Sequence, residues 1–131
     1  MSLFERFFNN LLGVTQPIQF ADQIAASSES TEEYEFLADG VLEGQLRIRF
    51  YKGSELDLWL YPKLVRIDTE EDIIQYRGTK KYVDGEDDIL TWHIRKKVKR
   101  GDKLTCRAVN NNAAFAYDYR LDASVNYEGR G

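Results

Sequence analysis

The side chains with the greatest capacity for chemistry are few and far apart in the sequence. The chain has a single histidine, His93, and a single cysteine, Cys106. A hydrolytic triad would need His93 as its base, together with a nucleophile and an orienting acid, and no serine stands in a G-x-S-x-G motif. Zinc would need more histidine or cysteine ligands than the chain contains. We therefore predict a protein that is not an enzyme and that uses no metal and no other cofactor.

Two acidic runs could offer oxygen ligands to a cation. They are T-E-E-D at residues 69–72 and D-G-E-D-D at residues 84–88. The second could hold calcium through its carboxylate oxygens, but it lacks the full D-x-D-x-D-G loop pattern. Runs of this kind are usually solvated turns, and we interpret both runs in that way.

Length and composition indicate one soluble domain. The 131 residues suffice for one hydrophobic core, and 43% apolar with 31% charged residues is ordinary for a globular protein. The net charge of −4 disfavours nucleic acid as a partner, because phosphate binding needs a basic surface. No apolar run reaches the roughly 20 residues of a membrane span, and we expect no signal peptide. A single cysteine permits no internal disulfide, which fits the cytoplasm.

The first 13 residues predict a short amphipathic helix. Ser2 and Glu5 have the spacing of a capping box, and Gly13 is placed to end a helix over residues 3–12. Such a helix could close the end of its own domain, dock as an arm on a neighbouring subunit, or lie on a membrane surface. The absence of a basic polar face disfavours the membrane. The apolar positions, which are our candidates for an interface, are Leu3, Phe4, Phe7, Phe8, Leu11 and Leu12.

Residues 14–131 read as a single β-domain, because apolar and polar residues alternate with a period of two. Even spacing of short strands, with turns between them, predicts an all-β fold: an antiparallel β-sandwich, jelly-roll-like, with about eight strands. Pro62 marks an edge position or a bulge. We predict a loop at 25–33 and strands at 33–38, 45–53, 55–63 and 114–127, with two more around a turn within 88–109.

One predicted strand places a row of positive charge on one face. Residues 91–99 alternate apolar side chains with Arg95, Lys97 and Lys99. The row could simply keep an edge strand soluble, or it could dock an acidic partner or a single nucleic-acid strand. A suitable acidic partner is the stretch of a neighbouring copy that contains Glu32, Glu33 and Glu35.

Trp59 and Tyr61 lie on the face of their strand that is opposite the leucines. If this face meets solvent, the two rings form an adhesive patch of the type found in protein interfaces and carbohydrate sites. If the strand is covered on both faces, for instance by the N-terminal helix, the rings belong to the core instead. We treat both residues as interface candidates.

Two stretches carry a resemblance to known proteins. The run VKRGDKLTCRAVNNNAAFAYDYRLDASVNYEG (98–129) combines a basic G-D turn, a strand, an asparagine-rich turn and a tyrosine-rich strand. The run GSELDLWLYPKLVR (53–66), followed by YRGTKKYVDG, is similar in style. Over residues 45–129 the chain resembles β-sandwich structural proteins of tailed viruses, which decorate capsids or form turrets and tail or portal interfaces. The resemblance implies a location in the virion.

We therefore expect a structural subunit that forms a homo-oligomer and contacts other virion proteins. Its helix and its β-sandwich faces would make the contacts. The competing expectation is a carbohydrate- or receptor-binding module that uses the exposed aromatic side chains Trp59, Tyr61 and Tyr51.

Overall fold

The computed structural model describes residues 15–51, 56–74, 80–87 and 90–128. The predicted helix and its six apolar candidates lie outside the described residues. Every regular element in the described ranges is a strand, so none of them is a helix of the length and apolarity that a membrane crossing requires. The eight strands are β1 (Thr15–Ile24), β2 (Glu29–Glu35), β3 (Gly40–Phe50), β4 (Leu58–Val65), β5 (Glu70–Asp72), β6 (Thr91–Val98), β7 (Lys103–Asn110) and β8 (Tyr117–Tyr127).

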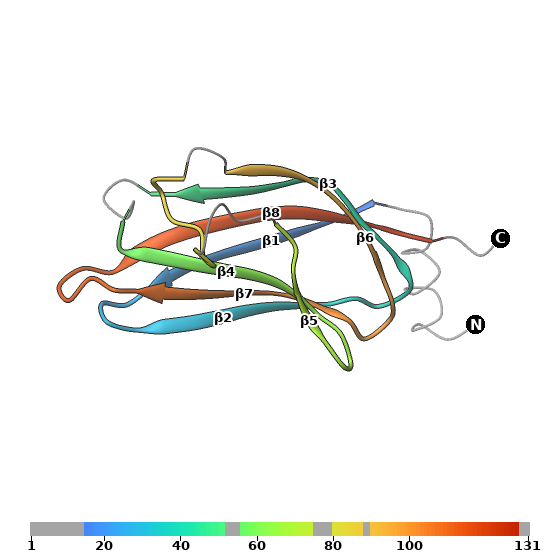
Figure 1. The fold of residues 1–131 in the computed structure, drawn as a ribbon, viewed down its shortest axis with the longest axis horizontal. Coiled ribbons are helices and arrows are strands. Elements are labelled where there is room, and N and C mark those ends of the chain that lie inside the picture. The colour runs from blue at the N-terminus through green and yellow to red at the C-terminus, as the bar shows by residue number, and fades with distance from the viewer. Residues whose placement is uncertain (1–14, 52–55, 75–79, 88–89, 129–131) are drawn as a thin grey trace, which may run out of the picture.

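The strands form two antiparallel four-stranded sheets that pack face to face (Figure 1). Sheet A has the order β1-β8-β3-β6, and sheet B has the order β2-β7-β4-β5. Apart from the β4–β5 hairpin, each connection carries the chain from one sheet to the other. Every other strand pairing therefore joins segments that are distant in the sequence, for example β1 with β8. The predicted eight-stranded antiparallel sandwich is confirmed.

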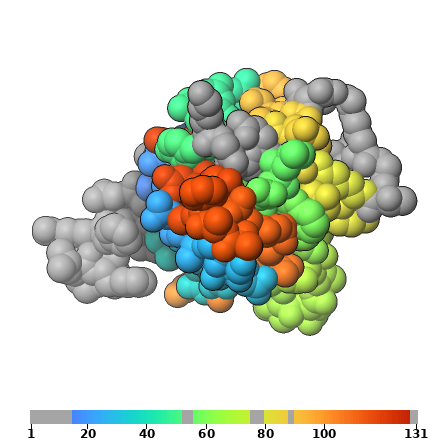
Figure 2. Space-filling model, turned by 90° about the vertical axis from the view of Figure 1, so that its left-hand side faces the viewer, coloured from blue at the N-terminus to red at the C-terminus, as the bar shows by residue number. Residues whose placement is uncertain are grey.

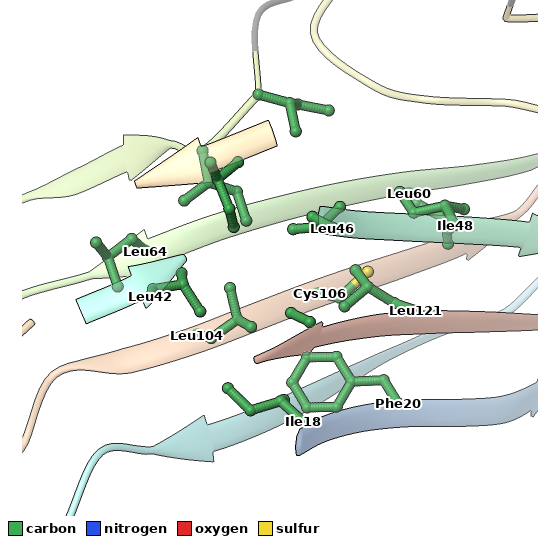
Figure 3. Close-up of a cluster of buried hydrophobic side chains, with 14 of the residues drawn as sticks. Ile18, Phe20, Leu42, Leu46, Ile48, Leu60, Leu64, Leu104, Cys106 and Leu121 are labelled. Atoms are coloured by element: carbon green, nitrogen blue, oxygen red, sulfur yellow. The ribbon is translucent and has the colours of Figure 1, made fainter. Parts of the chain in front are cut away.

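The core lies between the sheets, where the inward-facing residues of both sheets meet (Figure 3). The burial of β4 alternates without a break, so that Leu58, Leu60 and Leu64 are buried while their neighbours are half-buried on the outer face. Facing them from sheet A are residues such as Leu46 and Leu121. Alternation in the sequence thus corresponds to the two faces of each strand.

Several strand boundaries differ from the prediction. The acidic stretch expected to be a loop already forms β2 from Glu29, because its backbone pairs with β7 over seven residues. Part of the T-E-E-D run is not a turn but β5, which pairs with Lys63–Val65. Phe115, which falls within the strand predicted at 114–127, lies in the β7–β8 loop and is exposed. In each case the neighbouring strand decides the boundary, and a single segment does not reveal that neighbour.

Pro62 occupies a position where its missing N–H costs nothing. Leu60 exchanges both backbone hydrogen bonds with Val83, and the next pairing on that side of β4 is Lys63 with Asp72. Every second residue of a strand points its backbone to the same side, so the nitrogen of Pro62 points to the side of Val83 and β5. It lies there between the Leu60–Val83 pair and the Lys63–Asp72 pair. The predicted edge position or bulge is therefore wrong, because β4 is an inner strand and its pairing with β7 continues through Pro62 without a register shift.

Polar side chains join the loops at one end of the sandwich. Asn110 is buried, and its amide donates to the carbonyl oxygens of Ile24 and Phe115 at 3.0 and 2.8 Å. Its own side-chain oxygen accepts from the backbone of Asn112. Figure 2 looks onto this end, where the orange β7–β8 loop lies against the blue β1–β2 loop. One buried amide thus connects two loops that come from opposite ends of the sequence.

Candidate functional site

The outer face of sheet B carries an open groove of about 720 Å³. The groove crosses β2, β7, β4 and β5, and Lys81 lines it from the segment that precedes Val83. Its other lining residues are Tyr61 and Val65, two threonines, and basic and acidic side chains that alternate across the strands: Thr31, Glu33, Lys63, Glu70, Asp72, Lys103, Thr105 and Arg107. A groove of this size can accept a small ligand.

The charges across this face are largely paired with one another. Lys103 lies 3.6 Å from Glu33, and Lys63 lies 3.7 Å from Asp72, so each pair joins adjacent strands. Arg107 holds Glu29 through two nitrogens, at 3.2 and 3.0 Å. All of these side chains are partly exposed, so the pairs contribute little to stability. They do keep planar, hydrogen-bonding groups in fixed places along the groove.

Three aromatic rings lie side by side on the same face. Trp59 stacks on Tyr82 with 4.1 Å between the ring centroids and 12° between the planes, and its indole nitrogen donates to the carbonyl of Leu56. Tyr61 lies 6.1 Å from Tyr82, and the guanidinium of Arg107 lies 4.9 Å from the centre of the Tyr61 ring. Tyr61 lines the groove, whereas Trp59 does not.

The structure shows whether the face that carries Trp59 and Tyr61 meets solvent. Both belong to the outer face of sheet B, but both are half-buried, and Tyr82 covers one face of the Trp59 ring. Sequence reasoning missed Tyr82. The only signal was its position directly before the apolar residue Val83. In the structure Val83 pairs with Leu60, and the ring of Tyr82 therefore points to the outer face. Tyr51, the third expected aromatic, follows β3 of sheet A and does not line the groove.

Within the D-G-E-D-D run, residues 84–87 form a turn in which two acidic groups hold a cationic side chain. Lys80 lies 3.3 Å from Asp84 and 2.9 Å from Asp87, and its ammonium also lies 4.9 Å from the ring of Tyr82. Burial alone would lower the pKa of Lys80, but the hydrogen bonds to Asp87 and Asp84 outweigh it and raise the pKa above its usual value. Within the described ranges, no three acidic, histidine or cysteine side chains gather as metal ligands.

The structure places the predicted acidic and basic groups on different sheets. Arg95 and Lys97 point outward from β6, at the edge of sheet A, and Lys99 follows in the β6–β7 turn. Glu33 and Glu35 point outward from β2, at the edge of sheet B. Glu32 is half-buried and belongs to the other face of β2, so it separates from its two neighbours because alternate residues of a strand face opposite ways.

The sole histidine and the sole cysteine cannot act as a pair. His93 is exposed on the outer face of β6, while Cys106 is fully buried between the sheets. Burial raises the pKa of the Cys106 thiol to about 12. Burial, together with the neighbouring Cys106, also raises the pKa of Tyr119. These buried groups therefore stay protonated near neutral pH and serve packing.

Together, these features define the class of the protein: an eight-stranded antiparallel β-sandwich with a charged groove on one outer face, which Tyr61 also lines. In sequence comparisons, no protein-family model matches the chain and no curated protein matches it significantly.

Proposed function

We propose that the protein is a non-enzymatic assembly subunit with a jelly-roll fold, and that it serves as a virion structural protein in capsid decoration, a turret or a tail interface. The observation that carries the proposal is the strand order. In the jelly roll, eight strands form two Greek keys, and the chain passes back and forth between two four-stranded sheets. The orders β1-β8-β3-β6 and β2-β7-β4-β5 follow that pattern. Viral capsid domains are among the main users of this architecture.

The apolar residues near the N-terminus supply the association energy in this proposal. The strands that the structure describes begin at Thr15, after these apolar residues in the sequence. One fully buried leucine or phenylalanine contributes about 1.5–3 kcal/mol. Several of them together match the roughly 4–15 kcal/mol that association costs in lost freedom of motion. The segment would therefore act as an arm that docks on a neighbouring subunit.

Light scattering after gel filtration tests the proposal on the full chain and on the variant Phe7→Glu/Leu11→Glu. We expect a defined oligomer for the full chain and a folded protein of lower mass for the variant. The matched control is Asn9→Glu/Asn10→Glu, which adds two carboxylates at polar positions of the same segment and should keep the oligomer mass. A full chain that is monomeric at every concentration would refute self-assembly.

The groove around Tyr61 supports a second candidate function, the binding of a carbohydrate or a glycosylated receptor. An aromatic ring beside fixed charged pairs is a suitable surface for a sugar, because the ring packs on its apolar face and the pairs meet its hydroxyls. A glycan array followed by titration, with tryptophan fluorescence as readout, tests this function. Saturable binding that Tyr61→Ala abolishes and Tyr51→Ala leaves intact would favour it.

A further inference from the structure

We propose that strand β6 of one copy pairs in antiparallel fashion with strand β2 of a second copy, so that sheet A of the first continues into sheet B of the next. This inference rests on the proposed role in assembly and specifies how the copies meet. Both strands are at the edge of their sheets, and they have similar lengths of eight and seven residues. Within the described residues, each has a strand neighbour on one side only.

The free edge of β6 presents the backbone groups of its basic residues. Arg66 donates to the carbonyl of Lys97 at 2.8 Å, so the backbone of Lys97 points away from β3. Because the direction alternates along a strand, the backbone groups of His93 and Arg95 point the same way. The side chains of these three residues are exposed on the outer face of sheet A.

The free edge of β2 presents the backbone groups of its acidic residues. The carbonyl of Ser28 accepts from Asn110, and the N–H of Phe36 donates to Asp102, so the even-numbered residues turn their backbones toward β7. The odd-numbered residues therefore turn theirs to the free edge. They include Glu29, Glu33 and Glu35, whose side chains are exposed on the outer face.

Antiparallel pairing of the two edges would bring opposite charges together. Residues that face each other across such a pair project their side chains to the same side, with Cβ atoms about 4.5–5.5 Å apart. In one register Arg95 lies opposite Glu35 and Lys97 lies opposite Glu33. Lys97 and Glu35 form no ion pair with another described residue, and the pairs Arg95–Glu43 and Lys103–Glu33 are exposed and weak. These charges are therefore available to a partner.

The same charges disfavour the alternatives. Pairing of β6 with β6, or of β2 with β2, would place like charges opposite one another, which is destabilising. Charged edges also prevent indiscriminate strand addition. Only the combination of a basic edge with an acidic edge satisfies both sets of side chains.

The position of the two edges allows one copy to use both at once. β2 lies next to β1 on one side of the sandwich. On the other side, a groove of about 410 Å³ runs between β6 and the residues after β5, and Ile73, Ile74 and Trp92 line it. Ile73 and Ile74 are already buried, so an added strand would mainly cover the half-buried Trp92. Because the two edges are on opposite sides, the contact is head-to-tail and generates a ring or a filament.

A charge exchange in the full chain tests the inference. One variant carries Arg95→Glu and Lys97→Glu on β6, and the other carries Glu33→Lys and Glu35→Lys on β2. Each variant alone would meet like charge at the contact, so each should lose the oligomer mass in light scattering. A chain that combines all four substitutions restores opposite charge at every contact, in a ring of any size or in a filament, and should recover that mass. The control Arg47→Glu/Arg49→Glu makes the same change of charge at exposed positions of the inner strand β3, and should remain oligomeric.

Two results would overturn the inference while leaving the proposed assembly role intact. Either edge variant could retain the oligomer mass of the native chain, or the chain with all four substitutions could remain at the mass of the separate variants. Loss of the oligomer only in the Phe7→Glu/Leu11→Glu protein would then assign the contact to the N-terminal segment. A native chain that is monomeric at all concentrations would refute both proposals. Circular dichroism of each variant checks that the sandwich is folded.

Discussion

At the scale of single residues, close contacts limit which side chains the sandwich accepts. Gly40 begins β3 and pairs with both neighbouring strands, opposite Val98 on β6 and Tyr127 on β8. A Cβ atom at Gly40 would lie 2.6 Å from the carbonyl oxygen of Asn126 and 3.1 Å from the Cα of Tyr127. Both are backbone atoms, which cannot move aside as the end of a flexible side chain can. Glycine is therefore required here by space.

The variant Gly40→Ala should be clearly less stable than the native protein. Overpacking of this kind costs about 1–3 kcal/mol, because the strands must shift to admit the methyl group. Urea unfolding followed by circular dichroism measures the loss. The control Gln45→Ala removes an exposed side chain from the same strand, and its free energy of unfolding should stay within about 0.5 kcal/mol of the native value. Equal stability of the two variants would contradict the contact at Gly40.

Cys106 predicts a loss of stability at alkaline pH. Its pKa is about 12 in the folded protein, compared with about 8.5 in an unfolded chain. Since the folded-state pKa is the higher one, the contribution of the thiol is complete below pH ~8.5 and is lost as the pH rises toward 12. The stability difference between the native protein and Cys106→Ala should therefore shrink by about 2–3 kcal/mol from pH 8 to pH 10.5. Urea titrations at the two pH values measure it, and a constant difference would contradict the prediction.

At the scale of elements, buried polar groups join the loops at both ends of the sandwich. Asn110 secures the β1–β2 and β7–β8 loops at one end. Asp102 does the same at the other end, where it is buried, accepts from the backbone of Lys99 at 2.9 Å and lies 3.5 Å from Arg66. Gly101 precedes it with a φ of +92°, which suits the turn that joins β6 and β7. Asp102 thus connects this turn to the β4–β5 hairpin.

The substitution Asn110→Asp tests the connection between the loops. It replaces an amide that donates two hydrogen bonds by a carboxylate, which would face the carbonyl oxygens of Ile24 and Phe115 without a proton to offer. We expect a loss of about 2–4 kcal/mol in the free energy of unfolding. The same change at the exposed neighbour, Asn111→Asp, should cost less than about 1 kcal/mol. Similar losses for both variants would show that burial of Asn110 is unimportant.

At the scale of the whole molecule, the alternation of the chain between sheets makes the two sheets depend on each other. The strands of sheet A extend from β1 at Thr15 to β8, which ends at Tyr127. The strands of sheet B lie between these strands in the order of the chain. Neither sheet can form from a continuous part of the chain. The sandwich should therefore fold as one cooperative unit, and slowly, because most strand pairings close long loops.

Single-tryptophan proteins can measure this cooperativity. In Trp92→Phe the remaining Trp59 reports on sheet B, and in Trp59→Phe the remaining Trp92 reports on sheet A. Within each variant, the urea midpoint from tryptophan fluorescence should coincide with the midpoint from circular dichroism. A fluorescence midpoint that precedes the circular dichroism midpoint in one variant would show that one sheet unfolds before the other.

Local pattern was sufficient for the fold class and for many side-chain orientations. The alternation in β4 correctly assigned its leucines to one face and Trp59 and Tyr61 to the other, because a strand has a period of two wherever it lies in a sheet. The helix predicted from the periodicity of residues 3–12 lies outside the described residues.

Only the tertiary structure decided which segments become neighbours. β2 and β5 were missed or misplaced because their residues are polar and become strands only by pairing with β7 and β4. The ring of Tyr82 stacks on Trp59 because the next residue, Val83, forms a β-bridge with Leu60. Leu60 and Val83 are 23 positions apart in the sequence. The sequence by itself determined the faces of the strands, since those depend on adjacent residues. Strand order, the two charged edges and the groove depend on contacts between distant residues, which local pattern does not encode.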